Sequence, residues 1–262
     1  MTDRESVESN IKGAFEDGIL SRESASLLSG SLGPVVVAGA AGYDIENLST
    51  SDVTLVTLLV DQSSSIGGRN LEDAVRAGQA VLVDSMAESR EKDGILVALW
   101  TFDDTHRALH SYVPVEQATR LDNKNYRSVG STRLYDTWCD ALASNVAYAQ
   151  QLRDAGTLCR SVVVVITDGE DTSSRRTAGE CARLSKDLLA SEQFVLAFVG
   201  VGPDANFRQV ARSMGVPDGS ILEEKATTSS ALRRVFQMVS QSTIRASQGR
   251  IQPGPSVGFF GP

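Results

Sequence analysis

The chain is poor in cysteine and histidine, the residues on which disulfide, zinc and imidazole chemistry depend. Its 262 residues include three cysteines and two histidines. Cys139, Cys159 and Cys181 show no CxxC spacing, and an odd number of cysteines does not complete a disulfide framework. We therefore expect free thiols and a cytoplasmic protein. His106 and His110 have no cysteine or third histidine at ligand spacing, so a zinc site built on them is not expected.

Long apolar runs and excess positive charge are also missing from the sequence. No apolar segment approaches the ~18 residues that a membrane-spanning helix needs, and the opening stretch, MTDRESVESN, is polar. The formal net charge is −8, which argues against nucleic acid or an anionic membrane as the main partner. With 41% hydrophobic and 22% charged residues, the chain has the composition of a globular protein that buries one core.

Short apolar segments alternate with helical patterns through the middle of the chain. The expected strands are residues 54–61, 94–102, 105–115, 160–167, 194–201 and 220–224. The expected helices are residues 70–90, 134–155, 177–191, 204–214 and 229–245. This alternation predicts an α/β fold with a doubly wound, mostly parallel sheet and helices on both faces. We expect residues 105–115 to form one antiparallel edge strand.

The two ends of the chain differ from this central domain, which we assign to residues 52–245. Residues 1–33 carry apolar side chains at helical spacing and predict a helical hairpin. Such a hairpin packs on its own domain or on a partner, and we favour the first. Residues 34–51 are expected to be a connector or an edge strand. Residues 246–262 contain glycine and proline throughout and predict an extended or disordered tail.

The segment after the first core strand carries three oxygen-bearing side chains at alternate positions. Thr54–Val60 is an apolar run typical of a strand buried on both faces, and Asp61, Ser63 and Ser65 follow it. One carboxylate and two hydroxyls form a set suited to Mg²⁺ and unsuited to zinc. An ordinary turn, with Asp61 capping the next helix, explains the same residues. This segment alone does not decide between the two interpretations.

Two later loops add oxygen atoms at the same edge of the expected sheet. Thr132 comes just before a helix, and Asp168 follows a valine-rich strand. In an open α/β sheet, ligands bind outside the carboxyl ends of the strands, where loops converge. We therefore expect one cation site with two carboxylates and three hydroxyls, from Asp61, Ser63, Ser65, Thr132 and Asp168. Mg²⁺ takes six oxygens and keeps waters readily, which leaves a position for water or an external ligand.

Together these motifs resemble the von Willebrand factor type A (vWA) family. The resemblance is carried by Asp61-Gln-Ser63-Ser-Ser65, Gly130-Ser-Thr132-Arg-Leu-Tyr-Asp136 and Thr167-Asp168-Gly169, in that order, and covers about residues 52–245. It implies a metal-ion-dependent adhesion site (MIDAS), usually holding Mg²⁺, with Mn²⁺ or Ca²⁺ as alternatives. It also implies that Ser63, Ser65 and Thr132 ligate the metal directly or nearly so. Asp61 and Asp168 would act through water, and a partner's carboxylate would fill the open position.

Residues beside these motifs are candidates for supporting the metal or touching a partner. Arg133 and Tyr135 flank Thr132 and are better placed to contact a partner than to perform chemistry. Asp136 is either a partner of the ligands or a favourable negative charge in the first turn of its helix. Gly169 and Glu170 follow Asp168 and are candidates for the same roles, and Glu170 either tunes the site or caps the next helix.

The motifs favour binding over catalysis. A phosphoaspartate-forming hydrolase would need a second carboxylate where this chain has Ser63, and neither Ser63 nor Ser65 has a plausible histidine base. No GxxxxGK[ST] phosphate loop is present. We therefore expect an adaptor that binds an acidic side chain of a protein partner through Mg²⁺, and not an enzyme. A Mg²⁺-dependent hydrolase is the alternative from another class.

The compact build is similar to that of intracellular bacterial vWA proteins. That resemblance implies a MoxR-like AAA+ ATPase or a stress-response protein as the partner. A scaffold that uses its N-terminal hairpin as the partner surface, with a merely structural metal, is the alternative within binding proteins.

Overall fold

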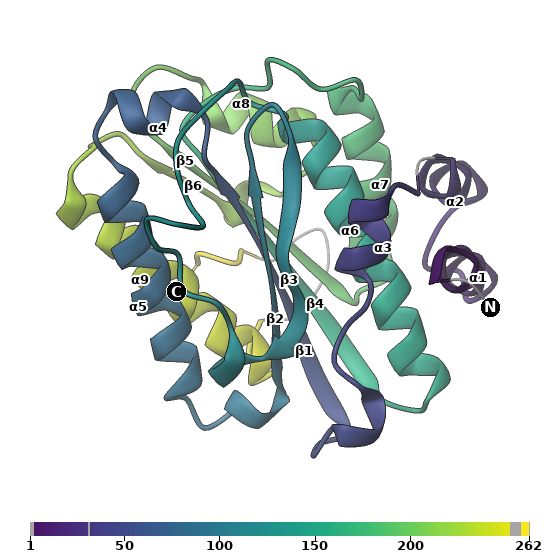
Figure 1. Ribbon diagram of the computed structural model, residues 1–262. Coiled ribbons are helices and arrows are strands. Elements are labelled where there is room, and N and C mark those ends of the chain that lie inside the picture. The colour runs from purple at the N-terminus through teal and green to yellow at the C-terminus, as the bar shows by residue number, and fades with distance from the viewer. Residues whose placement is uncertain (1–2, 31, 252–257, 262) are drawn as a thin grey trace.

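A six-stranded sheet forms the centre of the protein (Figure 1). The computed structural model describes residues 3–30, 32–251 and 258–261. The strands lie in the order β3-β2-β1-β4-β5-β6, and only β3 runs antiparallel to its neighbour. Their bounds are β1 Asp52–Asp61, β2 Ile95–Phe102, β3 His106–Pro114, β4 Leu158–Thr167, β5 Phe194–Val201 and β6 Ile221–Glu224. The predicted α/β sheet with one antiparallel edge strand is confirmed.

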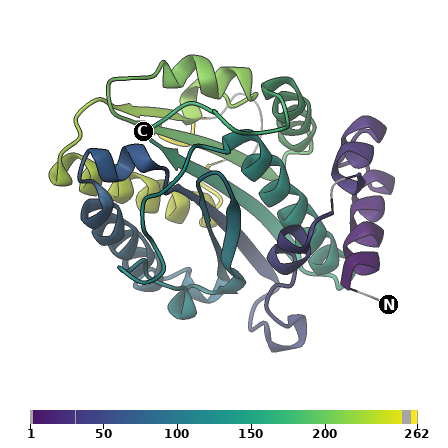
Figure 2. The same cartoon turned by 45° about the horizontal axis from the view of Figure 1, so that its top comes forward.

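Helices cover both faces of this sheet (Figures 1 and 2). One face is packed by α5 (Glu72–Ala87) and α9 (Ser229–Ser247), the other by α6 (Leu134–Asp154), α7 (Ala178–Ala190) and α8 (Phe207–Ser213). Along β1, Leu55 and Leu59 point into the core beneath α6, while Val56 and Leu58 point into the core beneath α5 and α9. This alternation explains why β1 is apolar at successive positions. Among the described residues, no helix is both long and apolar enough to span a membrane.

The N-terminal hairpin packs on α6 and α7. It consists of α1 (Asp3–Glu16) and α2 (Arg22–Ser29), and Ile11 and Leu28 are fully buried beneath it. The Ser21 backbone N–H donates to the Asp187 carboxylate over 2.8 Å, and the Gln150 amide donates to Asp17 over 2.7 Å. The favoured prediction, packing on its own domain, is therefore confirmed.

The prediction of an edge strand within residues 34–51 is wrong, because Pro34–Gly39 forms a short helix, α3. Proline fits the first helical turn, where its missing N–H costs no hydrogen bond. The helix packs closely on the main domain: the Ser144 hydroxyl donates to the Val36 carbonyl over 2.9 Å. A Cβ on Gly39 would lie 2.3 Å from the ring of Trp100, so only glycine allows this approach.

The described part of the C-terminal tail is packed and not disordered. Ile251 and Phe259 are buried in the core shared by α5 and α9. The Phe259 N–H donates to the Ser220 hydroxyl over 3.2 Å, and Arg245 donates to the Gly261 carbonyl over 2.8 Å. Residues 252–257 and 262, which the tail prediction also covers, lie outside the described residues.

Candidate metal centre

The strand order creates a topological switch point beside β1. The chain leaves β1 towards β2 on one side, while β4, β5 and β6 continue on the other side. The helices that follow β1 and β4, α5 and α7, lie on opposite faces of the sheet, and open α/β sheets bind ligands at such points. Asp61 ends β1 and Thr167 ends β4, and the preceding residues of the two strands, Val60 and Ile166, are direct partners in the register.

The loops after β1 and β4 bring three predicted site residues into contact. The Ser65 hydroxyl donates to Asp168 Oδ1 over 2.6 Å, and the Ser63 and Ser65 Oγ atoms lie 3.0 Å apart. Ser63 and Asp168 are each only 2% exposed. Ser63 is the N-cap residue of a five-residue helix, α4 (Ser64–Gly68), which the sequence pattern did not predict. The start of α4 therefore places the Ser65 hydroxyl between Ser63 and Asp168.

Asp61 is buried and is held by neutral donors. Its Oδ1 accepts the Ser63 N–H over 2.7 Å, and its Oδ2 accepts the Thr167 hydroxyl over 2.5 Å. The Tyr126 hydroxyl donates to the Asp61 carbonyl over 2.5 Å. Burial raises the pKa of Asp61 to about 6, although both hydrogen bonds favour the charged form. The alternative of an ordinary turn is correct in part: Asp61 accepts the N–H of Ser63, two residues on, as in an Asx turn, but the N-cap residue of α4 is Ser63 and not Asp61.

Thr132 is fixed by hydrogen bonds between loops. The Thr172 N–H donates to the Thr132 carbonyl over 2.8 Å, and the Thr132 N–H donates to the Thr172 hydroxyl over 2.9 Å. A Cβ on Gly169 would lie 3.5 Å from Thr132 Oγ1, which places this hydroxyl next to the loop that follows Asp168. The Ser64 N–H donates to the Gly130 carbonyl over 3.1 Å. The loops that carry all five predicted residues are thus joined.

Arg69 also belongs to this site, and sequence reasoning missed it. Its Nη1 donates to the Asp168 carboxylate and, over 3.2 Å, to the Asp168 carbonyl; its Nη2 donates to the Asp204 carboxylate. Burial raises the pKa of Asp168, while the Ser65 hydroxyl and the guanidinium offset part of this rise. No spacing signal marks Arg69, because its contacts depend on the direction in which the end of α4 points.

The predicted neighbours mostly hold the loops together. The Asp136 carboxylate accepts the backbone N–H groups of Arg175 and Arg176 over 3.1 and 2.9 Å, which ties the loop after β4 to α6. Asp136 therefore stabilises the loop that carries Asp168. Arg133 Nε lies 3.7 Å from Asp136. Tyr135 is partly buried against the core that α6 and α7 share.

The loop after Asp168 anchors the start of α6. Asp171 Oδ1 accepts the N–H groups of Leu134 and Tyr135 over 2.8 and 3.2 Å. Gly169 follows Asp168 directly, and Glu170 beside it is exposed. Glu170 is therefore accessible to a partner, whereas Asp171 is engaged as a helix cap.

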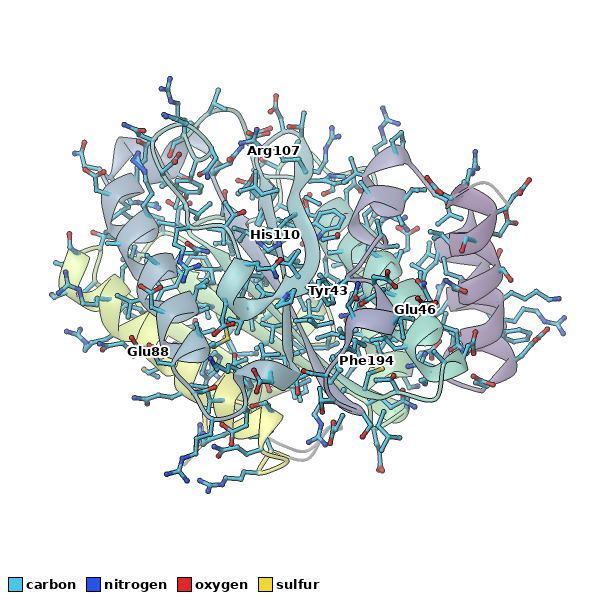
Figure 3. The ribbon with its side chains drawn as sticks, turned by 60° about the horizontal axis from the view of Figure 1, so that its bottom comes forward. Tyr43, Glu46, Glu88, Arg107, His110 and Phe194 are labelled. Carbon is cyan, nitrogen blue, oxygen red and sulfur yellow. The ribbon has the colours of Figure 1, made fainter. Side chains whose placement is uncertain are left out.

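Both histidines interact with residues around β3. His106 Nε2 lies 2.9 Å from Asp140 Oδ2. His110 Nδ1 lies 2.8 Å from the Ser111 carbonyl, and the Thr119 N–H donates to His110 Nε2 over 3.2 Å (Figure 3). Burial lowers the pKa of His110, so this side chain is held neutral.

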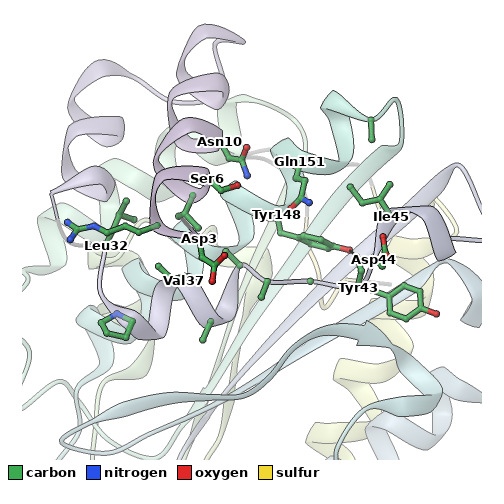
Figure 4. A pocket seen from close by; sticks show the side chains of 18 of the residues that line it. Asp3, Ser6, Asn10, Leu32, Val37, Tyr43, Asp44, Ile45, Tyr148 and Gln151 are labelled. Carbon is green, nitrogen blue, oxygen red and sulfur yellow. Dashed lines mark hydrogen bonds between the residues drawn. The ribbon is translucent and has the colours of Figure 1, made fainter. Parts of the chain in front are cut away.

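A cavity of about 950 Å³ lies elsewhere, between α1, α3, the segment after α3 and α6 (Figure 4). Tyr43, Asp44 and Tyr148 line it, and the lining includes none of the five predicted metal ligands. The candidate metal centre is therefore a small group of oxygens at the sheet edge, separate from this cavity.

The donor set fits a small, hard dication. Asp61 and Asp168 supply carboxylates, and the three hydroxyls add neutral oxygen donors. Across residues 3–30, 32–251 and 258–261, no group of three or more His, Cys, Asp or Glu side chains is arranged to hold a metal. A cation at this edge would therefore depend on the hydroxyl oxygens as well as on the two carboxylates.

Comparisons with known proteins agree with this architecture. Similar solved structures include the PilB minor pilin from Streptococcus sanguinis (12% identity, 74% of this chain and 62% of that chain, TM-score 0.54). They also include the pilus adhesin SpaC from Lactobacillus rhamnosus GG (17%, 76% and 31%, TM-score 0.55). A third is proximal thread matrix protein 1 from the mussel byssus (17%, 74% and 46%, TM-score 0.50). The chain spans less than two thirds of the length of each.

At these identities the structural likeness shows the fold alone. No curated protein matches the sequence. The family model for the von Willebrand factor type A domain, however, matches residues 56–245, a region that runs from β1 to α9 and includes all five oxygen-bearing residues. This chain therefore belongs to the von Willebrand factor type A domain family.

Proposed function

We propose that this vWA domain binds Mg²⁺ through Asp61, Ser63, Ser65, Thr132 and Asp168, and uses it to hold an acidic side chain of a protein partner. The observation that carries the proposal is the contact of Ser63, Ser65 and Asp168 at the switch point of the sheet. A bound dication would supply a positive centre that attracts an external carboxylate. Mn²⁺ and Ca²⁺ use the same kinds of oxygen ligand.

The charge balance supports binding over catalysis. Three of the five donors are neutral hydroxyls, so a dication keeps positive charge that an incoming Asp or Glu neutralises. Ser63 contacts Ser65, and Ser65 contacts Asp168, while both histidines are engaged around β3. A serine nucleophile would need a base beside it. We therefore propose a non-enzymatic adaptor with a complete MIDAS motif, and a MoxR-like AAA+ ATPase or a stress-response protein stays the predicted partner.

Calorimetric titration of chelator-treated protein with Mg²⁺ and with Mn²⁺ tests the metal site. We expect saturable binding to the wild type and a loss of about tenfold or more in affinity for Thr132→Ala, since one oxygen ligand is removed. Ser64→Ala is the matched control: Ser64 lies in the same loop, its side chain is exposed, and it contacts Gly130 through its backbone N–H. Folded wild type that binds neither metal would overturn the proposal.

A further inference from the structure

Arg69 lies where the candidate metal centre meets the loop after β5. It is the C-cap residue of α4, and its guanidinium bridges two carboxylates of different exposure. The Asp168 side chain is fully buried, whereas the Asp204 side chain is 67% exposed. The Arg69 side chain itself is 21% exposed. One end of this bridge therefore lies inside the site and the other end lies in solvent.

The buried end of the bridge completes the hydrogen bonding of Asp168. Oδ1 accepts the Ser65 hydroxyl, and Oδ2 accepts Arg69 Nη1. A buried carboxylate is costly unless its charge is balanced, and Arg69 supplies that balance. Metal ligation by Ser63 and Ser65 would bring a dication close to Asp168, and therefore close to the guanidinium. Two cations that share one carboxylate repel each other strongly in a partly buried site.

The exposed end of the bridge offers the guanidinium another position. Arg69 Nη2 already contacts Asp204, so a move away from Asp168 keeps one ion pair. Gly202 leaves room beside the guanidinium: a Cβ there would lie 3.6 Å from Arg69 Cζ, and the residue has φ +113°. Most residues do not adopt that φ, so glycine keeps this side of Arg69 free of a side chain.

We propose that Arg69 is an internal competitor of the metal, which balances Asp168 in the metal-free protein and transfers to Asp204 when a dication binds. This inference rests on the proposed metal site and adds a residue that sets its affinity. The site then binds metal more weakly than its five oxygen donors alone would. Asp204 favours metal binding indirectly, because it stabilises the guanidinium away from Asp168.

Titration of chelator-treated protein with Mn²⁺ tests this inference, because substitutions of Arg69 and of Asp204 are expected to change the metal affinity in opposite directions. Arg69→Gln removes the competing charge and is expected to tighten binding by about tenfold. Asp204→Asn leaves Arg69 with Asp168 alone and is expected to weaken binding several-fold. In the Arg69→Gln background, Asp204→Asn is expected to change affinity less than about twofold, because its effect acts through Arg69. Arg208→Gln, which removes the same charge at an exposed pair with Glu223, is the control.

Equal or weaker binding by Arg69→Gln would overturn the inference. A full loss of Mn²⁺ binding on Asp204→Asn in both backgrounds would show that Asp204 acts on the metal directly, which also overturns the inference.

Urea denaturation distinguishes failure of the competitor role of Arg69 from failure of the metal site. In chelator, Arg69→Gln should unfold at lower urea than the wild type, and saturating Mn²⁺ should remove or reverse that difference. If Mn²⁺ stabilises both proteins equally, the metal site stands and the competitor role falls; if it stabilises neither, both proposals fall.

Discussion

At the residue scale, Asp61 and Asp168 balance their buried charges in different ways. Asp168 contacts a guanidinium, whereas the two oxygens of Asp61 accept an N–H and a hydroxyl. Burial raises the pKa of Asp61 from 3.8 to about 6, and the two hydrogen bonds offset only part of this rise. A raised carboxyl pKa means that the folded protein holds the proton more tightly than the unfolded chain. This group's contribution to stability is thus greatest at acidic pH and falls as pH rises from 3.8 to about 6.

We expect Asp61→Asn to stabilise the metal-free protein at neutral pH. The amide carries no charge, its carbonyl can accept the Ser63 N–H, and its NH₂ can donate to Thr167, whose hydroxyl also lies 3.1 Å from the Gly169 carbonyl. The pKa rise corresponds to about 2–3 kcal/mol at pH 7.5 and much less at pH 4.5. Urea denaturation in chelator at both pH values measures this difference. Equal stabilisation at both values would contradict the charge explanation.

The sequence could single out five oxygen-bearing residues as candidates because each lies close to the end of a recognisable strand or the start of a helix. Asp61 ends β1, Asp168 directly follows β4, and Thr132 lies two residues before α6. Arg69 and Tyr126 could not be found in this way, since both reach the site from segments without a motif. Their contacts depend on how loops fold across one another, which residue type and spacing do not encode.

At the element scale, the α5–α9 pair depends on one glycine. A Cβ on Gly78 would lie 2.1 Å from the ring of Phe236, so the two helices approach closely at this point. We expect Gly78→Ala to lower the free energy of unfolding by about 1–3 kcal/mol, because the ring or the helix must move. Urea denaturation measures the change.

Gly179→Ala is the matched control for this prediction. Gly179 lies in the first turn of α7, where the nearest atom to an added Cβ is 3.9 Å away. Alanine favours the helix there, so the control should be neutral or stabilising by up to about 1 kcal/mol. If both variants lose stability, the close approach of Phe236 does not explain the effect of Gly78→Ala.

The short helices mark where sequence patterns fail at this scale. The run Val35–Val37 is β-branched and favours a strand by propensity, yet it lies in α3. Proline at the start and contact with α6 outweigh that weak preference. The five residues of α4 are too few to show a helical period, although they orient Ser63 and Ser65. Long strands and helices were predictable because their periodicity repeats.

At the scale of the whole molecule, the N-terminal hairpin and the metal centre are separate features of one fold. The hairpin packs against α6 and α7, while α4 starts from the loop after β1 (Figure 2). Deleting residues 1–33 would expose the buried surface under Ile11 and Leu28. Loss of partner binding after such a deletion would therefore report unfolding, so point substitutions on exposed residues are the better test.

Two sets of variants distinguish the metal centre from the hairpin as the partner surface. Lys12 and Arg22 are exposed on α1 and α2, so Lys12→Glu with Arg22→Glu changes the hairpin surface by four charge units and leaves its core intact. We expect immobilised protein to capture its partner in Mg²⁺ and release it in chelator, with Thr132→Ala inactive and the hairpin variant unchanged. An external carboxylate needs the dication, and it does not need the hairpin charges. Capture that survives chelator and Thr132→Ala, but is lost on charge reversal at Lys12 and Arg22, would place the partner on the hairpin and leave the metal a structural role.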